Sequence, residues 1–310
     1  MKEELNYEKV FNTLVDKTAE YLTKNNLKAM VLGISGGIDS TVVAAICHEV
    51  SKKTGIPLIG RSLPIKNKSD EFDVSKLVGE TFSSNFKIIN LSLTTKSLVV
   101  ELKAEECAEL TPIAEGNIQA RLRMMYLYNL ASIHKGLVMS TDNQTEYQLG
   151  FWTIHGDVGD FDPIQDLWKT EVYGLANWLL KFHYPEVYFD SPVEEIHKVT
   201  DMMGALRESI ALTPTDGLGI SNSDLDQIGA KDYATVDDIL RRLIPFKEYR
   251  QKHGESLHPH DEMAESDCWS QLCARHGEDV VDKVWSRHLA SEFKRKKAPI
   301  YIPRKEYEND

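Results

Sequence analysis

The sequence predicts an α/β protein with a doubly wound parallel sheet and a helical C-terminal extension. Up to about residue 180, short apolar runs typical of strands buried on both faces alternate with segments of helical periodicity. Beyond that residue the strand signals fade and the chain is helical and polar. The 310 residues and the 42% apolar content suit one domain, with a core over 1–180 and a helical extension over 181–310.

The predicted elements of the core follow from their apolar patterns. Four short apolar runs are expected to form strands, at 29–32, 57–60, 86–91 and 136–139. Helical spacing predicts helices at 7–25, 42–50, 69–81, 95–109 and 116–133, and a further helix that begins near Lys169 and buries Trp168, Val172, Leu175 and Leu179. Residues 213–232 are rich in Gly, Asp and Ser, and we expect a loop there.

The turn after the first predicted strand carries the strongest functional signal. The run Val31-Leu-Gly-Ile-Ser-Gly-Gly-Ile-Asp-Ser-Thr41 passes from a strand through a small-residue turn into a helix. Such a turn presents backbone N–H groups and a helix N-terminus to a phosphate. Ser35, Ser40 and Thr41 add hydroxyl groups. The spacing is not that of a Walker A loop, since no Gly-Lys-Ser/Thr follows.

Asp39 lies inside this predicted phosphate loop. A carboxylate beside phosphates is repulsive unless a cation lies between them, and Mg²⁺ is the cation that usually accompanies nucleotide phosphates. The loop therefore predicts magnesium as well as phosphate.

A second polar stretch, Ser140-Thr-Asp-Asn-Gln-Thr-Glu146, follows the fourth predicted strand. Ligands bind at the carboxyl ends of strands in doubly wound sheets, so Thr141 can reach a ligand there and Glu146 can serve as a second carboxylate for the metal. The alternative is an ordinary helix start, with Thr141 as N-cap and Glu146 favoured by the helix dipole.

The third stretch, Gly116-Asn-Ile-Gln-Ala-Arg-Leu-Arg-Met124, contains two arginines on a predicted helix. Helical spacing places Ile118, Leu122, Met125 and Tyr126 on one apolar face, which we expect to be buried. At about 100° per residue, Arg121 is expected beside this face and Arg123 far from it. Arg121 can then clamp an anion, or it can be a surface arginine that buries only its aliphatic stem.

The fourth stretch, 150–163, contains two Gly-Asp pairs and a third acid, and it leads to the helix that begins near Lys169. A lysine in the first turn of a helix is electrostatically unfavourable unless an anion lies nearby. Lys169 is therefore expected to meet phosphate.

Composition narrows the class of protein. The net charge of −12, with no broad basic tract, argues against nucleic-acid binding. No apolar window is long enough for a membrane span, so no membrane partner is expected, and the N-terminus lacks the apolar segment of a signal peptide. Four cysteines are too few for a disulfide scaffold, which predicts a cytoplasmic setting. Zinc binding by the Cys/His-rich tract 258–276 is a less favoured alternative to an ordinary polar surface, because the ligand pairs are not closely spaced.

The run Ser35-Gly-Gly-Ile-Asp-Ser-Thr41 resembles the pyrophosphate loop of the N-type ATP pyrophosphatases, which have the adenine nucleotide alpha hydrolase-like fold. Within that superfamily the colinear order of the motifs resembles NAD synthetase, over roughly residues 10–300. The matching segments are 35–40, Leu63-Pro64 with Asp70 and Glu71, 116–124, 141–146, 150–160, Lys169, 214–218 and 224–229.

The resemblance implies an ammonia-dependent ligase that amidates deamido-NAD through an acyl-adenylate and releases AMP and pyrophosphate. It implies a homodimer with the dinucleotide site at the interface. ATP contacts are implied for Gly33, Ile34, Ser35, Gly36, Gly37, Asp39, Ser40, Thr41, Thr141, Lys169 and Thr215. Mg²⁺ ligands are implied for Asp39 and Glu146, and deamido-NAD contacts for Arg121, Asp157, Asp160 and Lys294.

The sequence departs from the family pattern at two positions near the dinucleotide. Ile154 replaces a common lysine, and Phe293 replaces the histidine of a His-Lys pair. Only about 25 residues precede the first predicted strand, so no glutaminase domain is expected and ammonia is the expected nitrogen donor. The alternatives are another ATP pyrophosphatase, such as an amidotransferase or thiolase, and a non-catalytic nucleotide-binding homologue.

Overall fold

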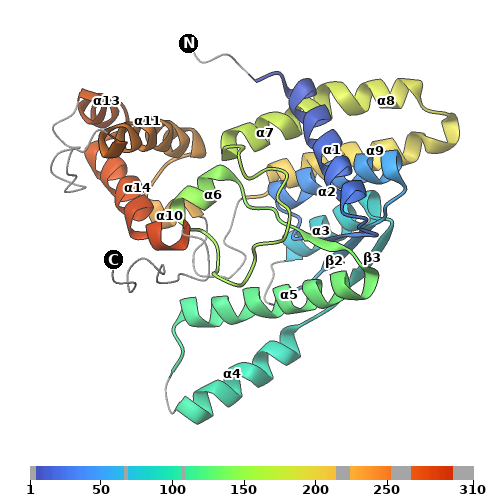
Figure 1. Ribbon diagram of the computed structural model, residues 1–310, viewed down its shortest axis with the longest axis horizontal. Coiled ribbons are helices and arrows are strands. Elements are labelled where there is room, and N and C mark those ends of the chain that lie inside the picture. Colours follow the sequence, from blue (N-terminus) through green and yellow to red (C-terminus); the bar gives the residue numbers. More distant parts are fainter. Residues whose placement is uncertain (1–4, 66–68, 107–108, 214–223, 253–266, 296–310) are drawn as a thin grey trace, which may run out of the picture.

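The computed structural model describes residues 5–65, 69–106, 109–213, 224–252 and 267–295. In these residues four parallel strands form a sheet in the order β3-β2-β1-β4. Helices surround this sheet (Figure 1). Their bounds are β1 (Met30–Gly33), β2 (Leu58–Ser62), β3 (Asn85–Ile88) and β4 (Leu137–Met139). The predicted α/β fold with a parallel sheet is confirmed, and each strand lies within a few residues of its expected place.

Helices cover both faces of the sheet. The bounds of the first five are α1 (Tyr7–Lys24), α2 (Ile38–Thr54), α3 (Ser69–Phe82), α4 (Ser92–Glu106) and α5 (Pro112–His134). α2 and α3 pack on one face, and α5 packs on the other against β1 and β4. Strand β1 is almost fully buried because it lies in the middle of these layers, which explains its continuous apolar run.

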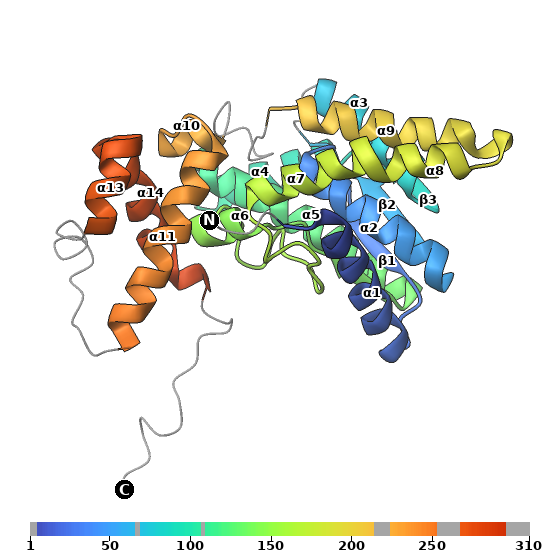
Figure 2. The same cartoon turned by 90° about the horizontal axis from the view of Figure 1, so that it is seen from above.

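The later helices divide between two hydrophobic clusters. α7 (Lys169–Trp178), α8 (Tyr184–Asp190) and α9 (Ile196–Ala211) join the cluster formed with α1, α2 and α3. A second cluster, around Trp269 and Trp285, is built by α10 (Asp224–Ile228), α11 (Tyr233–Lys252), α13 (Asp267–His276) and α14 (Glu278–Ala290). Residues after 180 thus belong to both clusters, and the second lies to one side of the sheet (Figure 2).

The short helix α6 (Gln144–Leu149) joins the two halves of the molecule. It follows β4 in the chain, yet Leu149 belongs to the second cluster and the helix packs against α11 and α14. Asn143, not Thr141, is its N-cap, with a capping box to Glu146.

His288 on α14 makes this junction sensitive to acid. It is buried, and its Nδ1 lies 3.1 Å from the carbonyl oxygen of Gln148 in α6. Burial, with Arg295 nearby, lowers the pKa of His288 to about 4. The unfolded chain, with a pKa near 6.5, binds this proton first, so the stability from His288 is complete above pH 6.5 and is lost as the pH falls towards 4.

We expect His288→Gln to reduce this pH dependence. The full shift corresponds to roughly 3 kcal/mol as an upper bound, so the wild-type free energy of unfolding should fall more steeply than that of the variant between pH 7 and pH 4.5. Urea unfolding at several pH values measures both slopes. Parallel curves for the two proteins would show that His288 does not set the acid sensitivity.

Candidate active site

The loop between β1 and α2 has the geometry of an anion cradle. Gly36 has a φ of +90°, and a Cβ at this position would lie 2.7 Å from the backbone nitrogen of Ser75. Only glycine fits this close approach and this backbone conformation. Gly37 is the N-cap of α2, so the N-terminus of that helix opens at the loop.

Hydroxyl groups hold this loop in shape. The Oγ atoms of Ser35 and Ser40 lie 3.0 Å apart, and the backbone N–H of Gly37 donates to Ser35 Oγ at 3.2 Å. Ser40 also donates to the carbonyl oxygen of Gly37. Thr41 differs from these residues: it is fully buried, its hydroxyl lies 2.7 Å from Ser209 Oγ, and it is not part of the cavity wall.

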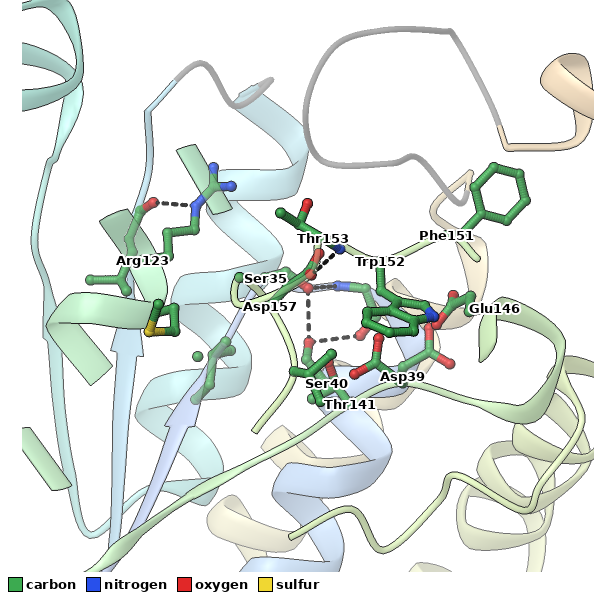
Figure 3. Close-up of a pocket in the computed structure, with 18 of the residues that line it drawn as sticks. Ser35, Asp39, Ser40, Arg123, Thr141, Glu146, Phe151, Trp152, Thr153 and Asp157 are labelled. Carbon is green, nitrogen blue, oxygen red and sulfur yellow. Dashed lines mark hydrogen bonds between the residues drawn. The ribbon is translucent and has the colours of Figure 1, made fainter. Parts of the chain in front are cut away.

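A cavity of about 420 Å³ opens above the loop, at the carboxyl ends of the strands (Figure 3). Its position is the one predicted for a ligand in a doubly wound sheet. Among the residues implied by the resemblance, those in its wall are Gly33, Ile34, Ser35, Gly37, Asp39, Ser40, Thr141, Glu146, Asp157, Lys169 and Lys294. The sequence motifs therefore converge on one cavity.

Asp39 and Glu146 lie together in this cavity (Figure 3), and the ammonium group of Lys169 joins them. Lys169 Nζ lies 2.5 Å from Asp39 Oδ2 and 2.8 Å from Glu146 Oε1. Asn143 Nδ2 donates to the other oxygen of Asp39 at 2.8 Å. Burial alone would lower the pKa of Lys169, but Asp39 and Glu146 raise it well above its ordinary value. The anions beside Lys169 are two carboxylates, and its contact with phosphate stays a prediction.

Asp237 of α11 fixes the start of the helix that carries Lys169. Its carboxylate accepts from the backbone N–H and the hydroxyl of Thr170, at 3.0 and 2.7 Å. The hydroxyl of Thr145 also donates to Asp237 and accepts from the backbone N–H of Lys169 at 2.9 Å. Burial raises the pKa of Asp237, whereas these hydrogen bonds lower it. Asp237 belongs to none of the sequence motifs, and only the fold brings it to Thr145 and Thr170.

Further carboxyl groups lie near Asp39 and Glu146. Burial raises the pKa of Asp162 to about 7 and holds that of Asp142 well above its usual range. Ser140 Oγ donates to Asp142 at 2.7 Å. Asp157 is solvent-accessible and faces the cavity, where it accepts from the backbone N–H of Thr153 at 2.6 Å, and partial desolvation by the surrounding protein raises its pKa. A raised pKa favours the protonated, neutral form of these carboxyl groups.

Lys294 anchors the loop that closes one side of the cavity. Its ammonium group donates to the carbonyl oxygens of Gly150 and Trp152, at 2.6 and 2.5 Å, and lies 5.6 Å from the centre of the Trp152 ring. The adjacent Phe293 is exposed, and so is Ile154 in part. Lys294 thus connects the end of the described chain to the predicted dinucleotide loop.

The expected orientation of the two arginines on α5 is wrong. Arg123 lies in the cavity wall and donates from Nε to the carbonyl oxygen of Leu63 at 3.1 Å (Figure 3), and burial lowers its pKa. Arg121 is exposed and donates to the carbonyl oxygen of Ile154 at 3.3 Å. The reason is that α5 buries Gly116, Gln119, Ala120, Leu122 and Ala131, whereas Met125, assigned to the buried face, is 60% exposed.

Two other predicted contact residues lie elsewhere. Asp160 is exposed, outside the cavity wall, and accepts from the backbone N–H of Val138 at 2.9 Å. It also hydrogen-bonds Tyr128, and burial together with Asp160 raises the pKa of Tyr128 to about 12. Thr215 and the neighbouring motif 214–218 lie outside the described residues.

The Cys/His-rich tract shows no metal centre in its described part. His276 Nε2 lies 2.8 Å from Asp238 Oδ2 in an ion-pair network with Arg242 and Arg275. No group of three or more His, Cys, Asp or Glu side chains within the described ranges is arranged as a metal site. His258 and His260 fall outside those ranges. Nor does any described helix combine the length and apolar character that a membrane span requires.

Comparison of the chain with known proteins identifies its family. Residues 10–298 match the NAD synthase family model. The chain is 31% identical over 254 residues to an NH(3)-dependent NAD(+) synthetase of Thermococcus sibiricus, covering 82% of this chain and 87% of the relative. It is 30% identical over 262 residues to an NH(3)-dependent NAD(+) synthetase of Pyrococcus furiosus, covering 84% and 88%.

Solved structures share the fold. An NMN synthetase from Francisella tularensis superposes with a TM-score of 0.69 at 23% identity, covering 97% of this chain and 100% of that one. An NH3-dependent NAD synthetase from Campylobacter jejuni, in complex with the nitrate ion, gives 0.61 at 22% identity, covering 96% and 100%. These superpositions show the fold. The match to the family model over residues 10–298 and the two relatives of 30–31% identity show that the chain belongs to the NAD synthase family and is a ligase.

Proposed function

We propose that this cavity carries out the ATP-dependent amidation of deamido-NAD to NAD, with ammonia as nitrogen donor. The observation that carries the proposal is the convergence of the phosphate loop, two carboxylates and Lys169 at the carboxyl ends of the strands. The family match and the names of the relatives support the substrates. The family match to NAD synthase favours this activity over that of another amidotransferase or thiolase of the ATP pyrophosphatase superfamily.

Asp39 and Glu146 are the residues that would hold Mg²⁺. Both face the cavity beside the phosphate loop, and both already share one cation, the Lys169 ammonium group. Mg²⁺ is usually held by one or two carboxylates together with substrate phosphates, so this donor set fits the metal. When bound, the metal would supply charge stabilisation at the departing pyrophosphate.

The chain's own residues would bind and position the two substrates. The loop from Gly33 to Ser40 would bind the ATP phosphates through backbone N–H groups and hydroxyls, and Thr141 would contact the nucleotide at the end of β4. The nicotinate carboxylate would attack the α-phosphorus to form an acyl-adenylate, and ammonia would then displace AMP. No residue need form a covalent bond, so positioning provides most of the rate.

Deamido-NAD is assigned to the other side of the cavity. Lys294 holds the 150–152 loop there, and Asp157 lies in the wall below it. Arg123 lies in the cavity wall, where Arg121 was expected, and adds a positive charge there. Arg121 and Asp160 remain proposed contacts, to be reached only if the dinucleotide extends beyond this cavity.

A homodimer through the outer face of α4 and α5 would extend the site in that way. These two helices expose several large apolar side chains: Leu93, Val100, Ile113, Met125 and Ile133. Arg121 lies on α5 and is exposed as well. An apolar face of this kind usually marks a protein–protein interface. Cytoplasmic location is part of the proposal, and the free thiols of Cys47, Cys268 and Cys273 are compatible with it.

We expect Met125→Glu to dissociate the proposed dimer, because a charge would be buried at an apolar interface. Sedimentation equilibrium should give twice the chain mass for the wild type and the single-chain mass for the variant. Phe189→Glu, at an even more exposed apolar residue on α8, is the control and should leave the mass unchanged. A monomeric wild type, or a dimer unaffected by Met125→Glu but split by Phe189→Glu, would contradict the assignment.

The proposed function is tested by comparing ammonium with glutamine as nitrogen donor. The purified chain is supplied with deamido-NAD, ATP and Mg²⁺, and with ammonium or glutamine in separate reactions. We expect NAD with ammonium and little with glutamine. Nicotinate mononucleotide in place of deamido-NAD shows whether the adenylate half of the dinucleotide is needed. Absence of product with every donor would favour a non-catalytic homologue, and efficient use of glutamine would contradict ammonia dependence.

A further inference from the structure

The ammonium group of Lys169 occupies the position that the proposed metal requires. It contacts one oxygen of Asp39 and one oxygen of Glu146, at 2.5 and 2.8 Å. Lys169 is only 2% exposed, so these contacts are its principal electrostatic compensation inside the protein. Its charge reduces the repulsion between the two carboxylates in the cavity wall.

The lysine and a metal ion cannot share these carboxylate oxygens in the same arrangement. Mg²⁺ binds oxygen at about 2.0–2.1 Å in near-octahedral geometry, and an ammonium group at hydrogen-bond distance from both acids would lie next to it. Two adjacent cations repel, so binding of the metal must move the ammonium group away.

The surroundings allow the side chain to move while its backbone stays fixed. The backbone N–H of Lys169 donates to Thr145, and the next residue is held by Asp237, which fixes the start of α7. Ser35, Gly37 and Ser40 of the phosphate loop line the same cavity, so a phosphate bound there would offer the displaced ammonium group a new partner. A lysine stem has several rotatable bonds for such a change.

We propose that Lys169 is a positioning residue that holds the carboxylates of Asp39 and Glu146 together in the free protein. When ATP binds, Mg²⁺ displaces the ammonium group from these carboxylates. The inference rests on the proposed function, since it takes Asp39 and Glu146 as the metal ligands. Its consequence is that the free protein resists the metal: a divalent cation alone must displace the lysine with no phosphate to receive it. ATP removes this penalty, so metal and nucleotide bind together.

The test measures metal affinity without turnover. Mn²⁺ serves as the probe, and its free concentration is followed by electron paramagnetic resonance with no nucleotide present. We expect Lys169→Met to bind Mn²⁺ at least about tenfold more tightly than the wild type, which corresponds to about 1.4 kcal/mol. Addition of α,β-methylene-ATP should tighten Mn²⁺ binding strongly in the wild type and much less in the variant.

Lys247→Met is the matched control, because Lys247 is also a largely buried lysine in an ion pair, with Glu292 at 2.9 Å. It should bind Mn²⁺ as the wild type does. If Lys169→Met does not fold, Lys169→Gln replaces it, since an amide can still donate to a carboxylate without a charge. Equal or weaker Mn²⁺ binding by the Lys169 variants would overturn the inference. If Asp39→Asn leaves Mn²⁺ binding in the presence of nucleotide unchanged, the metal assignment itself is wrong.

Discussion

Replacing Asp39 with asparagine is expected to abolish adenylation while the protein stays folded. The carboxylate lies at the N-terminus of α2, in the cavity wall, where it meets Lys169 and Asn143. Metal-assisted charge stabilisation contributes several kcal/mol to the barrier, and each 1.36 kcal/mol is a tenfold change in rate. We therefore expect a loss of roughly a thousandfold in kcat. Steady-state release of pyrophosphate measures it.

Glu146→Gln serves as a parallel test of the metal role, and Asp16→Asn serves as the control. Glu146→Gln should lose activity in the same way and should need more Mg²⁺, because the second carboxylate of the pair is gone. Asp16→Asn removes an acid of an exposed ion pair with Lys53, and its activity should equal that of the wild type. Turnover of Asp39→Asn within about tenfold of the wild type, less than 1.4 kcal/mol of barrier, would exclude the proposed metal role.

Gly36→Ala is expected to have the second largest effect, on both the stability and the use of ATP. The residue has a φ of +90°, and the new Cβ would meet the backbone nitrogen of Ser75 at 2.7 Å and the carbonyl oxygen of Glu71 at 2.9 Å. Backbone strain of this kind costs on the order of 1–3 kcal/mol, and α3 must move away from the loop. We expect the free energy of unfolding to fall by at least about 2 kcal/mol and kcat/KM for ATP to fall by roughly a hundredfold.

Gly204→Ala provides the comparison. Gly204 lies in α9, and nothing lies within 4 Å of the position of its Cβ. Alanine there should leave the activity unchanged and raise the stability slightly, since it favours the helix. Denaturant unfolding and ATP kinetics of both variants separate the two cases. Equal behaviour of the two alanine variants would show that the phosphate loop does not depend on the close approach of Gly36 to α3.

The fold was predictable because its core elements carry strong local signals. Strands β1, β2 and β4 contain short apolar runs, and the order of strand, turn and helix around Gly36 has few other structural solutions. Strand β3 differs from the expected buried strand: it lies at the edge of the sheet, contains Asn85 and Lys87 and is largely exposed. The start of α5 was missed by four residues, although Thr111 and Pro112 form an N-cap and a first-turn proline. The alternative of an ordinary helix start at α6 placed the N-cap at Thr141, whereas Asn143 is the N-cap and forms a capping box with Glu146.

The candidate site was predictable to the extent that it lies on consecutive motifs. Asp39, Glu146 and Lys169 each follow a strand end or begin a helix, and the fold brings them together. The arginines on α5 were assigned wrongly because the helix carries apolar residues on two faces, and Met125 belongs to the exposed one. Asp237 could not be found from the sequence, because only packing of α11 on α7 places it beside Thr145 and Thr170.

Transfer of oxygen from the substrate carboxylate tests the central claim most directly. Deamido-NAD labelled with ¹⁸O in the nicotinate carboxylate is converted with ATP, Mg²⁺ and ammonium, and the products are analysed by mass spectrometry. Attack on the α-phosphorus in this cavity predicts one ¹⁸O atom in the phosphate of each AMP and unlabelled pyrophosphate. Formation of ADP with ¹⁸O in inorganic phosphate would contradict the account, because the carboxylate would then have attacked the γ-phosphorus.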